Sequence, residues 1–476
     1  MQVTDTTTEL TEDPLADGLT VATVATSSLG DHSYVAADGE VAVVIDPQRD
    51  VDRLIAAAGR LGARITAVLE THVHNDYVSG GLELSRLTGA EYGVAAADQA
   101  PFEHRPLRDG DVLELSARTR VRVVATPGHT FHHLSYVLEG DAGPVGVFTG
   151  GSLLLGTTGR TDLLGSEHSQ ELARHQHASA RKLADLLPDG AQVWPTHGFG
   201  SFCSATQSSG ETADIAEQRR INPALTLAEA AFVEQALSGL DSYPAYYAHM
   251  GVRNAEGPES LDLRPPEPAA PEELKRRLAA GEWVVDLRNR TAYADSHLAG
   301  IVSLGLDGPL ATWLGWMIDW GAPVTLVGET GEQVAAARRE LARIGIDALA
   351  GAAAGQPAEL AVDPGQLRDT PTAMFADLAD ALRGRPGDLP VADVVLDVRT
   401  NNEFRAAHVQ DAVHVPLYEL KDRLTEIPAG TVWVHCGSGY RATAAASVLE
   451  QAGRPSVIVD DQFGNAENAG VPMTAI

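Results

Sequence analysis

The sequence contains very little cysteine: only Cys203 and Cys436 occur among its 476 residues. Two thiols so far apart exclude a fold built on disulfide bonds, and they are typical of a reducing cytoplasm, where we expect the protein to reside. The chain also lacks a continuous apolar run of about 18 residues and a basic N-terminus followed by an apolar stretch. We therefore expect neither a membrane span nor a secretory signal.

Basic residues are scarce as well. The chain has 35 Lys and Arg against 65 Asp and Glu, which gives a formal net charge of −30. Such an acidic chain disfavours nucleic acid and anionic membrane surfaces as partners, because both are negatively charged. The hydrophobic fraction of 44% is nevertheless sufficient for a chain that folds throughout. Its length predicts roughly two to four domains, preceded by a polar, disordered tail over residues 1–16.

The pattern of apolar residues predicts an α/β multidomain protein. Between residues 17 and 262, short β-rich runs such as 41–45 and 121–125 alternate with helical stretches such as 169–187. A helix-rich connector closes this block, and a proline-dense linker follows over 264–271. The first block is thus predicted to be one domain with a helical C-terminal connector.

The remainder of the chain contains an internal repeat. An apolar strand that ends in Asp-x-Arg occurs at Asp286 and again at Asp397, and a histidine follows eleven positions after each aspartate. Each copy then continues into a second apolar strand, a turn and a helix. Two copies of one α/β domain, over 263–358 and 368–476, are the simplest explanation.

The second copy has the clearer chemistry. Its second strand ends in a short turn that leads into a helix. The turn reads Cys436, Gly437, Ser438, Gly439, Tyr440 and Arg441. Backbone N–H groups and the positive end of the helix dipole stabilise a thiolate or a persulfide on such a sulfur atom. The glycines let the turn curl into a cradle, and Arg441 adds a fixed positive charge for an anionic substrate.

This turn resembles the active loop of the rhodanese family, which is six residues long and begins with cysteine. The related phosphatases have a loop one residue longer, so the length here favours sulfur over phosphate. The resemblance implies that Cys436 is the nucleophile and that Arg441 and the intervening backbone bind the substrate. In the first copy Gly328 stands at the nucleophile position and Gln333 at the arginine position, so that copy resembles a catalytically silent rhodanese domain.

The N-terminal block carries a histidine pattern that is typical of a metal site. His72, His74 and Asp76 directly follow an apolar, β-rich run. Residues two apart on an extended backbone face the same side, so the two imidazoles can converge on one ion. Two further histidines follow in the segments Thr-Pro-Gly-His129 and Trp-Pro-Thr-His197.

Together these segments resemble the metallo-β-lactamase fold, whose metal motif reads Thr-His-x-His-x-Asp-His. The resemblance implies an αββα sandwich that binds metal. The implied ligands are His72, His74, Asp76, His129 and His197. Two positions depart from the family pattern. Tyr77 replaces the last histidine of the motif, which argues against a full second metal site, and Gly151 replaces a metal-ligating aspartate.

A single metal is typical of the persulfide dioxygenase branch of this fold, which holds one ferrous ion with two histidines and an aspartate. The resemblance assigns these ligands to His72, His129 and the position now occupied by Gly151. The candidates for the third ligand are then His74, Asp76, Asp162 and water. We expect one Fe(II), with zinc, weak binding or no metal at all as the alternatives.

The order of the three domains resembles that of bacterial sulfide-detoxification enzymes, which join a persulfide dioxygenase to two rhodaneses. This resemblance implies oxidation of a low-molecular-weight persulfide by O₂ to sulfite, coupled to sulfur transfer by Cys436 that yields thiosulfate. It also implies a homo-oligomer, and it leaves the thiol carrier unnamed. Cys203 either carries sulfane sulfur or is a small buried residue. Arg160 either binds a carboxylate of the carrier or forms an internal ion pair.

Three other functions fit the same residues. A pure sulfurtransferase would use only the second rhodanese copy, with the first domain as a weakly metal-binding or inactive module. A hydrolase of the glyoxalase II kind would need a metal-activated water and usually two metals, which Tyr77 and Gly151 disfavour. A non-enzymatic sulfur sensor would need no turnover at Cys436.

Overall fold

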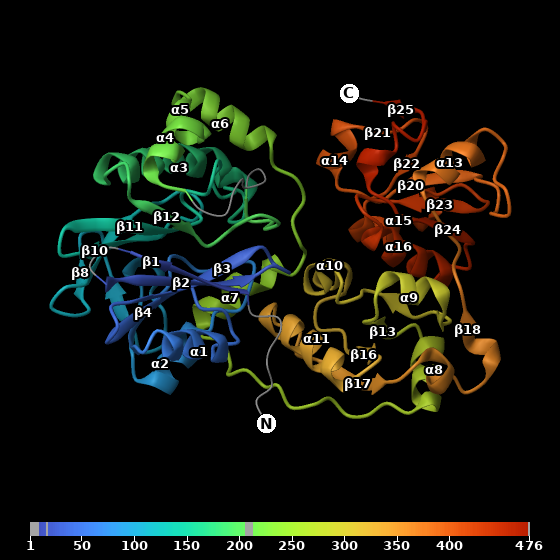
Figure 1. The fold of residues 1–476 in the computed structure, drawn as a ribbon, viewed down its shortest axis with the longest axis horizontal. Coiled ribbons are helices and arrows are strands. Elements are labelled where there is room, and N and C mark those ends of the chain that lie inside the picture. The colour runs from blue at the N-terminus through green and yellow to red at the C-terminus, as the bar shows by residue number, and fades with distance from the viewer. Residues whose placement is uncertain (1–8, 16–17, 205–212, 475–476) are drawn as a thin grey trace. The chain divides into compact units, whose positions relative to one another are not determined.

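The chain divides into two compact units (Figure 1). The residues that the computed structural model describes are 9–15, 18–204 and 213–474. The first unit reaches residue 262 and includes 342–345, and the second contains 263–341 and 346–476. Each unit has its own sheets and its own apolar core.

The first unit is built on two β-sheets. One sheet has seven strands in chain order, antiparallel from β1 to β4 and parallel from β4 to β7. Its strands are β1 (Glu9–Pro14), β2 (Thr20–Thr26), β3 (Asp31–Ala37), β4 (Val41–Ile45), β5 (Arg64–Leu69), β6 (Glu91–Ala95) and β7 (Arg105–Leu107). The other sheet has the order β12-β11-β10-β9-β8. Its strands are β8 (Val112–Glu114), β9 (Arg120–Ala125), β10 (Leu134–Gly140), β11 (Gly143–Gly150) and β12 (Gln192–Pro195).

The core of this unit lies between the two sheets. In β9 apolar and polar residues alternate, so Val121 and Val123 are fully buried whereas Arg120 is exposed. Tyr34 and Phe148 come from different sheets, and their ring centroids lie 5.3 Å apart. Because side chains alternate between the faces of a strand, this pattern places an apolar layer between the sheets.

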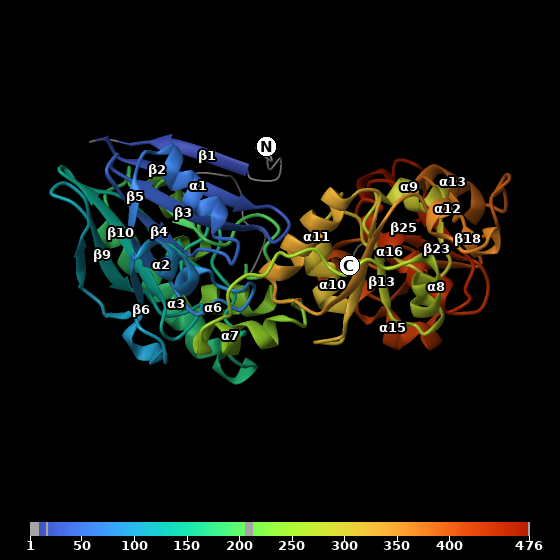
Figure 2. The same cartoon turned by 90° about the horizontal axis from the view of Figure 1, so that it is seen from below.

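Helices cover the outer faces of both sheets (Figures 1 and 2). Those on the seven-stranded sheet are α1 (Asp52–Arg60) and α2 (Gly81–Thr88). Those on the five-stranded sheet are α3 (Ser169–Leu186), α4 (Ile215–Ile221), α5 (Pro223–Thr226) and α6 (Glu229–Ser238). One further helix, α7 (Tyr247–Glu256), follows. The layers form the αββα sandwich that the sequence predicted.

The second unit contains two parallel sheets of the same plan, in the orders β15-β13-β16-β17 and β22-β20-β23-β24-β19. The strands of the first sheet are β13 (Trp283–Asp286), β15 (Val302–Ser303), β16 (Val324–Gly328) and β17 (Leu349–Ala354). Those of the second are β19 (Thr372–Ala373), β20 (Val394–Asp397), β22 (Val413–His414), β23 (Val432–His435) and β24 (Ser456–Val459). The sequence repeat thus corresponds to two similar domains, whose limits at 263–358 and 368–476 stay a prediction.

The helices of the second unit also follow the repeat. Those of the first copy are α8 (Pro271–Ala279), α9 (Arg290–Asp295), α10 (Leu310–Met317) and α11 (Gly331–Arg343). Those of the second copy are α13 (Phe375–Leu382), α14 (Asn401–Ala406), α15 (Leu420–Arg423) and α16 (Tyr440–Gln451). In each copy the longest helix, α11 or α16, begins just after the turn that follows a central strand.

The Asp-x-Arg element forms the same buried ion pair in both copies. Arg288 contacts Asp286 at 2.6 Å, and Arg399 contacts Asp397 at 2.6 Å. Each arginine also donates, at 2.7 Å, to a backbone carbonyl eight residues farther along. The arginine therefore ties the end of a core strand to the segment after the next helix, which fixes the local fold of each copy.

Residues 9–14 do not belong to a disordered tail, and this part of the sequence prediction was wrong. They form β1, which pairs antiparallel with β2, and Leu10 packs partly buried on the cluster beneath α1. The polar composition misled the prediction because this edge strand is held mainly by backbone pairing. Residues 1–8 and 16 of the predicted tail lie outside the described residues.

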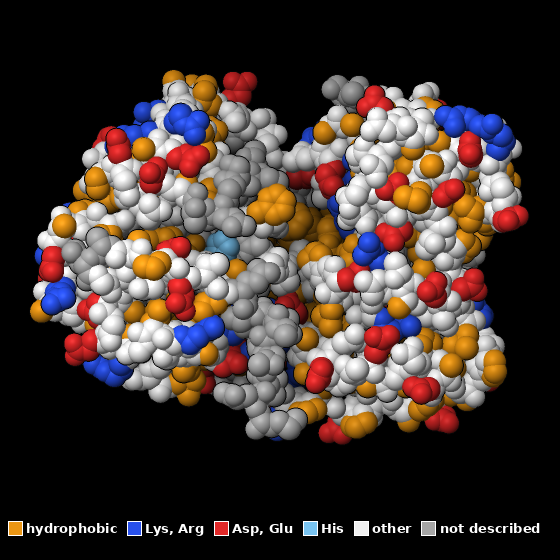
Figure 3. Space-filling view, in the orientation of Figure 1, with side chains coloured by type: hydrophobic (Ala, Val, Ile, Leu, Met, Phe, Trp, Pro, Cys, Tyr) orange, Lys and Arg blue, Asp and Glu red, His pale blue; other side chains and the backbone are white. Residues whose placement is uncertain are grey.

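Charged side chains of both signs share the surface. On the face drawn in Figure 3, basic side chains are scattered among acidic ones. Some of these side chains form ion pairs at the surface. Arg423, for example, contacts Glu426 at 2.7 Å, and both side chains are partly exposed. Within the described ranges, no helix is both long and apolar enough to cross a membrane.

Replacing Asp397 with Asn should destabilise the second unit strongly, because Arg399 would remain buried without its counter-ion. Removing one partner of a buried pair costs about 3–5 kcal/mol. Asp286→Asn should cost a similar amount in the first copy, whereas the exposed control Glu426→Gln should cost less than about 1 kcal/mol. Chemical denaturation followed by circular dichroism gives the three free energies of unfolding. An equal loss in the free energy of unfolding for Asp397→Asn and Glu426→Gln would contradict a structural role of the buried ion pair.

Candidate functional site

Four histidines from separate loops meet in the first unit, where strands of both sheets end. His72 and His74 follow β5, His129 follows β9 and His197 follows β12. The ring centroids of His72 and His74 lie 4.1 Å apart, and those of His72 and His129 lie 4.8 Å apart. The His129 and His197 rings are separated by 5.2 Å. The structure thus brings together the four histidines that the sequence singled out, and all are buried.

Hydrogen bonds fix the orientation of three of these rings. The Nδ1–H of His129 donates to the carbonyl of Arg160 at 2.7 Å. Nδ1 of His72 lies 2.8 Å from the hydroxyl of Thr71, and Nδ1 of His197 lies 3.0 Å from Asp31. Partners at Nδ1 leave the opposite nitrogen, Nε2, as the free lone pair of each neutral ring.

The free nitrogens fit a bound metal ion. Nε2 of His72, His129 and His197 and Nδ1 of His74 are buried, and nothing in the described part of the chain hydrogen-bonds to them. The donor atoms of His72, His74 and His197 lie within 4.8 Å of one another. Burial and the neighbouring imidazoles lower the pKa of His72 well below its ordinary value, and that of His129 to about 3. Burial alone would lower the pKa of His197, but Asp76 and Asp31 raise it to about 9. Buried imidazoles that converge in this way suit a transition metal, which binds them in their deprotonated form.

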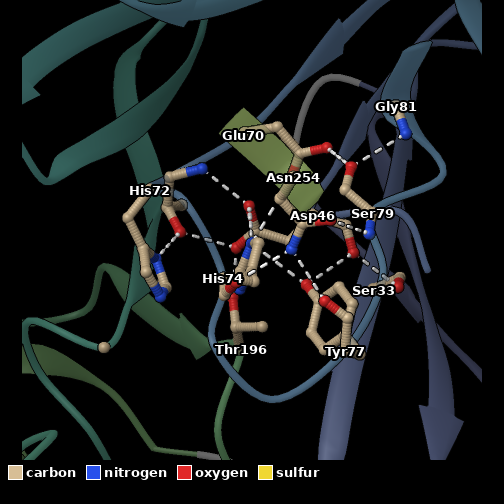
Figure 4. A network of polar contacts seen from close by, with 12 residues as sticks. Ser33, Asp46, Glu70, His72, His74, Tyr77, Ser79, Gly81, Thr196 and Asn254 are labelled. Atoms are coloured by element: carbon tan, nitrogen blue, oxygen red, sulfur yellow. Dashed lines mark hydrogen bonds and ion pairs between the residues drawn. The ribbon is translucent and has the colours of Figure 1, made fainter. Parts of the chain in front are cut away.

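Two carboxylates lie beside Nε2 of His74, on the side away from the other histidines (Figure 4). Its Nε2 lies 3.2 Å from Asp46 and 3.3 Å from Glu70. Burial alone would lower the pKa of His74, but these two carboxylates raise it well above the ordinary value. They orient the ring so that Nδ1 faces the other histidines.

Tyr77 closes off the place of a second metal ion. Its buried hydroxyl lies 3.0 Å from Nε2 of His74 and donates to the carbonyl of Asp46. Asp76, next to it, lies 3.1 Å from Nδ1 of His197 and therefore orients that ring. A phenol and an orienting carboxylate do not form the imidazole–carboxylate pair of a binuclear site.

Gly151 lies at the end of β11 with its backbone against the His129 ring. A Cβ atom built on this residue would collide with that imidazole. The Gly151 N–H donates to Nε2 of His133 at 3.0 Å, and its carbonyl accepts from Gln176 at 2.9 Å. At the position of the aspartate of the related enzymes, this chain therefore has no carboxylate and no space for a larger side chain. The residues do not fit a site of two histidines and one carboxylate in which position 151 supplies the carboxylate.

Arg160 forms an internal ion pair, which is one of the two roles that the sequence left open. Its guanidinium contacts Asp162 at 2.7 and 2.9 Å and donates to the carbonyls of Phe202 and Asp241. Its side chain is buried and lies over the ring of Tyr243. Asp162 is engaged in this pair and is not among the donor groups that gather around the histidines in the described residues.

Cys203 lies against the histidine cluster. Its sulfur is within 4.8 Å of the donor nitrogens of His129 and His197, and its side chain is fully buried. Burial raises the pKa of the Cys203 thiol well above its ordinary value. Cys203 is thus both buried and close to the histidines, and its role as a carrier of sulfane sulfur stays a prediction.

A cavity of about 430 Å³ lies beside the cluster in the first unit. Its lining includes Val73, Asn75, Thr130, Phe131, Leu164 and Tyr243. Asp98 and His132, paired at 2.8 Å, supply its charged side chains, and no Lys or Arg is among the described residues that line it. The cavity therefore suits a small, largely uncharged group next to the site.

The cysteine turn of the second unit has the geometry expected of a sulfur-binding loop. Cys436 follows β23 directly and is almost fully buried. The Gly439 N–H donates to the sulfur at 3.2 Å. Gly439 has a φ of 95° and leaves no room for a Cβ beside Asp460, so glycine is required at this point of the turn. α16 begins at the next residue, which directs its N-terminus at the sulfur.

Arg441 is held at the rim of this turn. Its guanidinium contacts Glu403 through two bonds of 2.6 and 2.7 Å. The ring of Trp313, from the first copy of the repeat, lies 5.4 Å from the same guanidinium. Arg441 is thus positioned from both copies, and a substrate anion would compete with Glu403 for its donors.

The first copy has neither a nucleophile nor a cation in the equivalent turn. The strand carrying Asp-x-Arg aligns Val327 with His435, so the next residues, Gly328 and Cys436, are equivalent. The Gln333 side chain turns back and accepts a backbone hydrogen bond from the same turn at 2.7 Å. The first copy therefore has a glycine at the position of the nucleophile Cys436 and a neutral amide at the position of Arg441.

Sequence reasoning missed the residues that surround the histidines. Asp31, Asp46 and Glu70 contact the imidazoles. Asp46 ends an apolar run and Glu70 lies four residues before His74, but neither signal assigned a role, and Asp31 occurs in no spacing pattern. His133 stacks on His72 with ring centroids 5.0 Å apart. The only sequence signal for His133 was its place four residues after His129, which is too common a spacing to single out a residue.

Two families match this sequence. The metallo-beta-lactamase superfamily matches residues 29–197, and the rhodanese-like domain matches 270–353 and 377–462. The chain is a metallo-β-lactamase superfamily protein with two rhodanese-like domains. The four site histidines fall within the first match and Cys436 within the last.

The first unit of this fusion protein is similar to enzymes of two activities. The human protein named persulfide dioxygenase ETHE1, mitochondrial, is 28% identical over 238 residues, which are 49% of this chain and 81% of that protein. A hydroxyacylglutathione hydrolase of Gloeobacter violaceus is 30% identical over 184 residues, 38% of this chain and 68% of that protein. A metallo-beta-lactamase structure from Staphylococcus aureus subsp. aureus COL has a TM-score of 0.63 and 26% identity. That match covers 71% of this chain and 99% of that chain.

A methyl group at position 151 should disturb the histidine cluster. In Gly151→Ala the new Cβ would displace the His129 ring, and such overpacking costs about 1–3 kcal/mol. We expect a lower midpoint of thermal unfolding and a reduced metal content by elemental analysis. Gly190→Ala is the matched control, because nothing lies within 4 Å of a Cβ at that position. Unchanged metal content and stability in Gly151→Ala would show that the cluster has more space than described.

The ion pair of Glu403 and Arg441 should make stability pH-dependent. Burial raises the pKa of Glu403, but Arg441 outweighs it and lowers this pKa to about 2. The pair's contribution is therefore complete above the ordinary pKa of about 4.3 and is lost as the pH falls toward 2. We expect Glu403→Gln to lower the midpoint of thermal unfolding at pH 7 and to have less effect at pH 3. For the exposed control Asp422→Asn, the difference in unfolding midpoint from the unchanged protein should not become smaller between pH 7 and pH 3. An effect of Glu403→Gln that is the same at both pH values would contradict a stabilising ion pair between Glu403 and Arg441.

Proposed function

We propose that this protein is a sulfur-metabolism enzyme that oxidises a low-molecular-weight persulfide to sulfite in its first unit and transfers sulfane sulfur at Cys436, giving thiosulfate. The observation that carries the proposal is the presence, on one chain, of a metal-fitting histidine cluster and of a complete rhodanese turn. The similarity to a persulfide dioxygenase over 81% of that protein supports the first half.

The first half of the reaction needs a metal ion, for which we propose iron(II), with zinc as the alternative. His72, His129 and His197 would hold it, with His74 beside them. Bound iron(II) would supply the redox chemistry that joins dioxygen to the outer sulfur of the substrate. Zinc has no redox chemistry, so a zinc-loaded site would leave only the sulfurtransferase half active. One persulfide, one dioxygen and one water then give one thiol, one sulfite and two protons, so the sulfur loses the four electrons that dioxygen gains.

The chain's own residues would bind and enclose the substrate. The cavity lined by Phe131, Leu164 and Tyr243 would receive the carrier part of the persulfide, with its sulfur directed at the histidines. Because Arg160 is saturated by Asp162, it orders this wall rather than binding a carboxylate of the carrier. A carrier that presents little charge at this point fits the lining best.

The second half uses Cys436 as a nucleophile. Its thiolate attacks the outer sulfur of a persulfide, which releases the carrier thiolate and leaves a persulfide on Cys436. Sulfite then attacks that outer sulfur, and the electron pair of the broken S–S bond returns to Cys436 as thiosulfate leaves. The N–H of Gly439 stabilises the charged sulfur, and Arg441 attracts the sulfite anion. Both halves on one chain raise the local sulfite concentration at Cys436.

We also propose that the protein forms a homo-oligomer.

Two alternatives have specific observations in their favour. The missing side chain at Gly151 favours a protein in which only the rhodanese half is active. The 30% identity to a hydroxyacylglutathione hydrolase favours thioester hydrolysis in the first unit, although Tyr77 fills the place of a second metal.

Anaerobic reconstitution with iron(II), followed by addition of a persulfide such as glutathione persulfide, should produce oxygen uptake and sulfite. Cys436→Ser should keep the oxygen uptake and lose thiosulfate formation, because its change lies only in the second half. His129→Ala should lose the oxygen uptake by at least about 100-fold and keep thiosulfate:cyanide sulfurtransferase activity, since a ligand is essential to metal chemistry. Sulfurtransferase activity without any oxygen uptake would overturn the first half, and hydrolysis of a glutathione thioester would favour the hydrolase.

A further inference from the structure

The histidine cluster lacks an anionic ligand. In the related mononuclear sites one carboxylate offsets part of the charge of a divalent ion, and here Gly151 stands at its position. The carboxylates close to the cluster, such as Asp31 and Asp46, contact the outer nitrogens of His197 and His74 instead. A cation held by imidazoles alone would remain uncompensated in a buried site.

Two acidic side chains lie near the free nitrogens. The Asp76 carboxylate is 3.9 Å from Nδ1 of His74, but it also pairs with Nδ1 of His197 at 3.1 Å. The Cys203 thiol is the other. The sulfur of Cys203 and the donor nitrogens of His129 and His197 all lie within 4.8 Å of one another. Donor atoms around a tetrahedral ion, bonded at about 2.0–2.3 Å, lie about 3.5 Å apart, so modest side-chain rotations would bring these three into contact with one ion. Nε2 of both histidines is buried, and nothing among the described residues hydrogen-bonds to either atom.

The backbone of Arg160 holds the cysteine and a histidine in this arrangement. Its N–H donates to the carbonyl of Cys203 at 2.8 Å, and its carbonyl accepts from Nδ1–H of His129 at 2.7 Å. The N–H of Cys203 is in turn bound by the hydroxyl of Ser201 at 3.2 Å. One residue thus fixes both the sulfur-bearing backbone and the imidazole, as supporting residues do in metal sites.

We propose that Cys203 is a metal ligand: its thiolate, with Nε2 of His129 and His197, replaces the carboxylate that Gly151 cannot provide. His197 also belongs to a second group with His72 and His74, whose donor atoms lie within 4.8 Å of its own. When the ion binds, the sulfur–hydrogen bond of Cys203 is exchanged for a sulfur–metal bond, and one proton leaves to solvent. A set of imidazoles with one thiolate suits zinc, iron(II) or cobalt(II). This ligand assignment does not depend on the oxidation of persulfide.

Cobalt(II) provides the test, because a cobalt–thiolate bond gives an ultraviolet charge-transfer band that imidazole and carboxylate ligands do not. Anaerobic titration of the metal-free full chain should develop this band with one equivalent of cobalt. The same titration of Cys436→Ser should give the same band and the same affinity, since Cys203 is then the only thiol in the chain. Cys203→Ser should lose the band and bind cobalt at least about tenfold more weakly, the smallest loss typical even of supporting residues.

One further variant, together with the Cys436→Ser titration, makes the outcome decisive. Cys203→Asp should recover much of the affinity without the band, because it returns a carboxylate to the site. If the Cys203 variants fail to fold, Cys436→Ser decides alone: no charge-transfer band in that protein overturns the proposal. A band that persists in Cys203→Ser would overturn it as well. A normal band in a protein without oxygen uptake would leave the ligand assignment intact and refute only the proposed oxidation.

Discussion

The burial of four imidazoles is the constraint on which the first unit depends. A buried ring nitrogen without a partner is costly, so each ring is held at one nitrogen by a protein group. Arg160 holds His129, and Asp31 holds His197. The other nitrogens have no hydrogen-bond partner among the described residues, and a bound ion would satisfy them. The carboxylates and backbone groups around the cluster are therefore as much a part of the site as the histidines.

The same constraint accounts for the two departures from the family pattern. Tyr77 keeps a hydrogen bond to His74 at 3.0 Å while removing an imidazole, so the network that orients His74 is retained with one ligand fewer for a second metal. Gly151 allows the His129 ring to sit close to the backbone, and the Cys203 sulfur lies within 4.8 Å of the donor nitrogens of His129 and His197. If Cys203 binds the ion as proposed, a thiolate replaces the missing carboxylate as a source of negative charge.

The sequence predicted the parts of the structure that depend on spacing. The His72 and His74 pair, the repeat and the turn at Cys436 are all encoded within a few residues. By contrast, Asp46 reaches His74 through tertiary packing, which leaves no local pattern, and Glu70, four residues before His74, carries no spacing that marks it as a partner of the ring. β1 escaped prediction because its stability comes from pairing with β2 rather than from its own polar residues. The meeting of the histidines was therefore predictable, the carboxylates around them were not, and the ligand set stays a prediction.

The two rhodanese-like copies separate the stability of a fold from its chemistry. Both retain the buried Asp-x-Arg pair, which holds a strand to the next segment, but only the second retains the cysteine. The silent copy still contributes: Arg290 contacts Asp460 at 2.9 Å, and the Tyr440 hydroxyl donates to the carbonyl of Gly305 at 3.0 Å. These contacts lie on both sides of the active turn. A copy without a nucleophile therefore still contributes, because its residues contact the loop at which we propose the sulfur transfer.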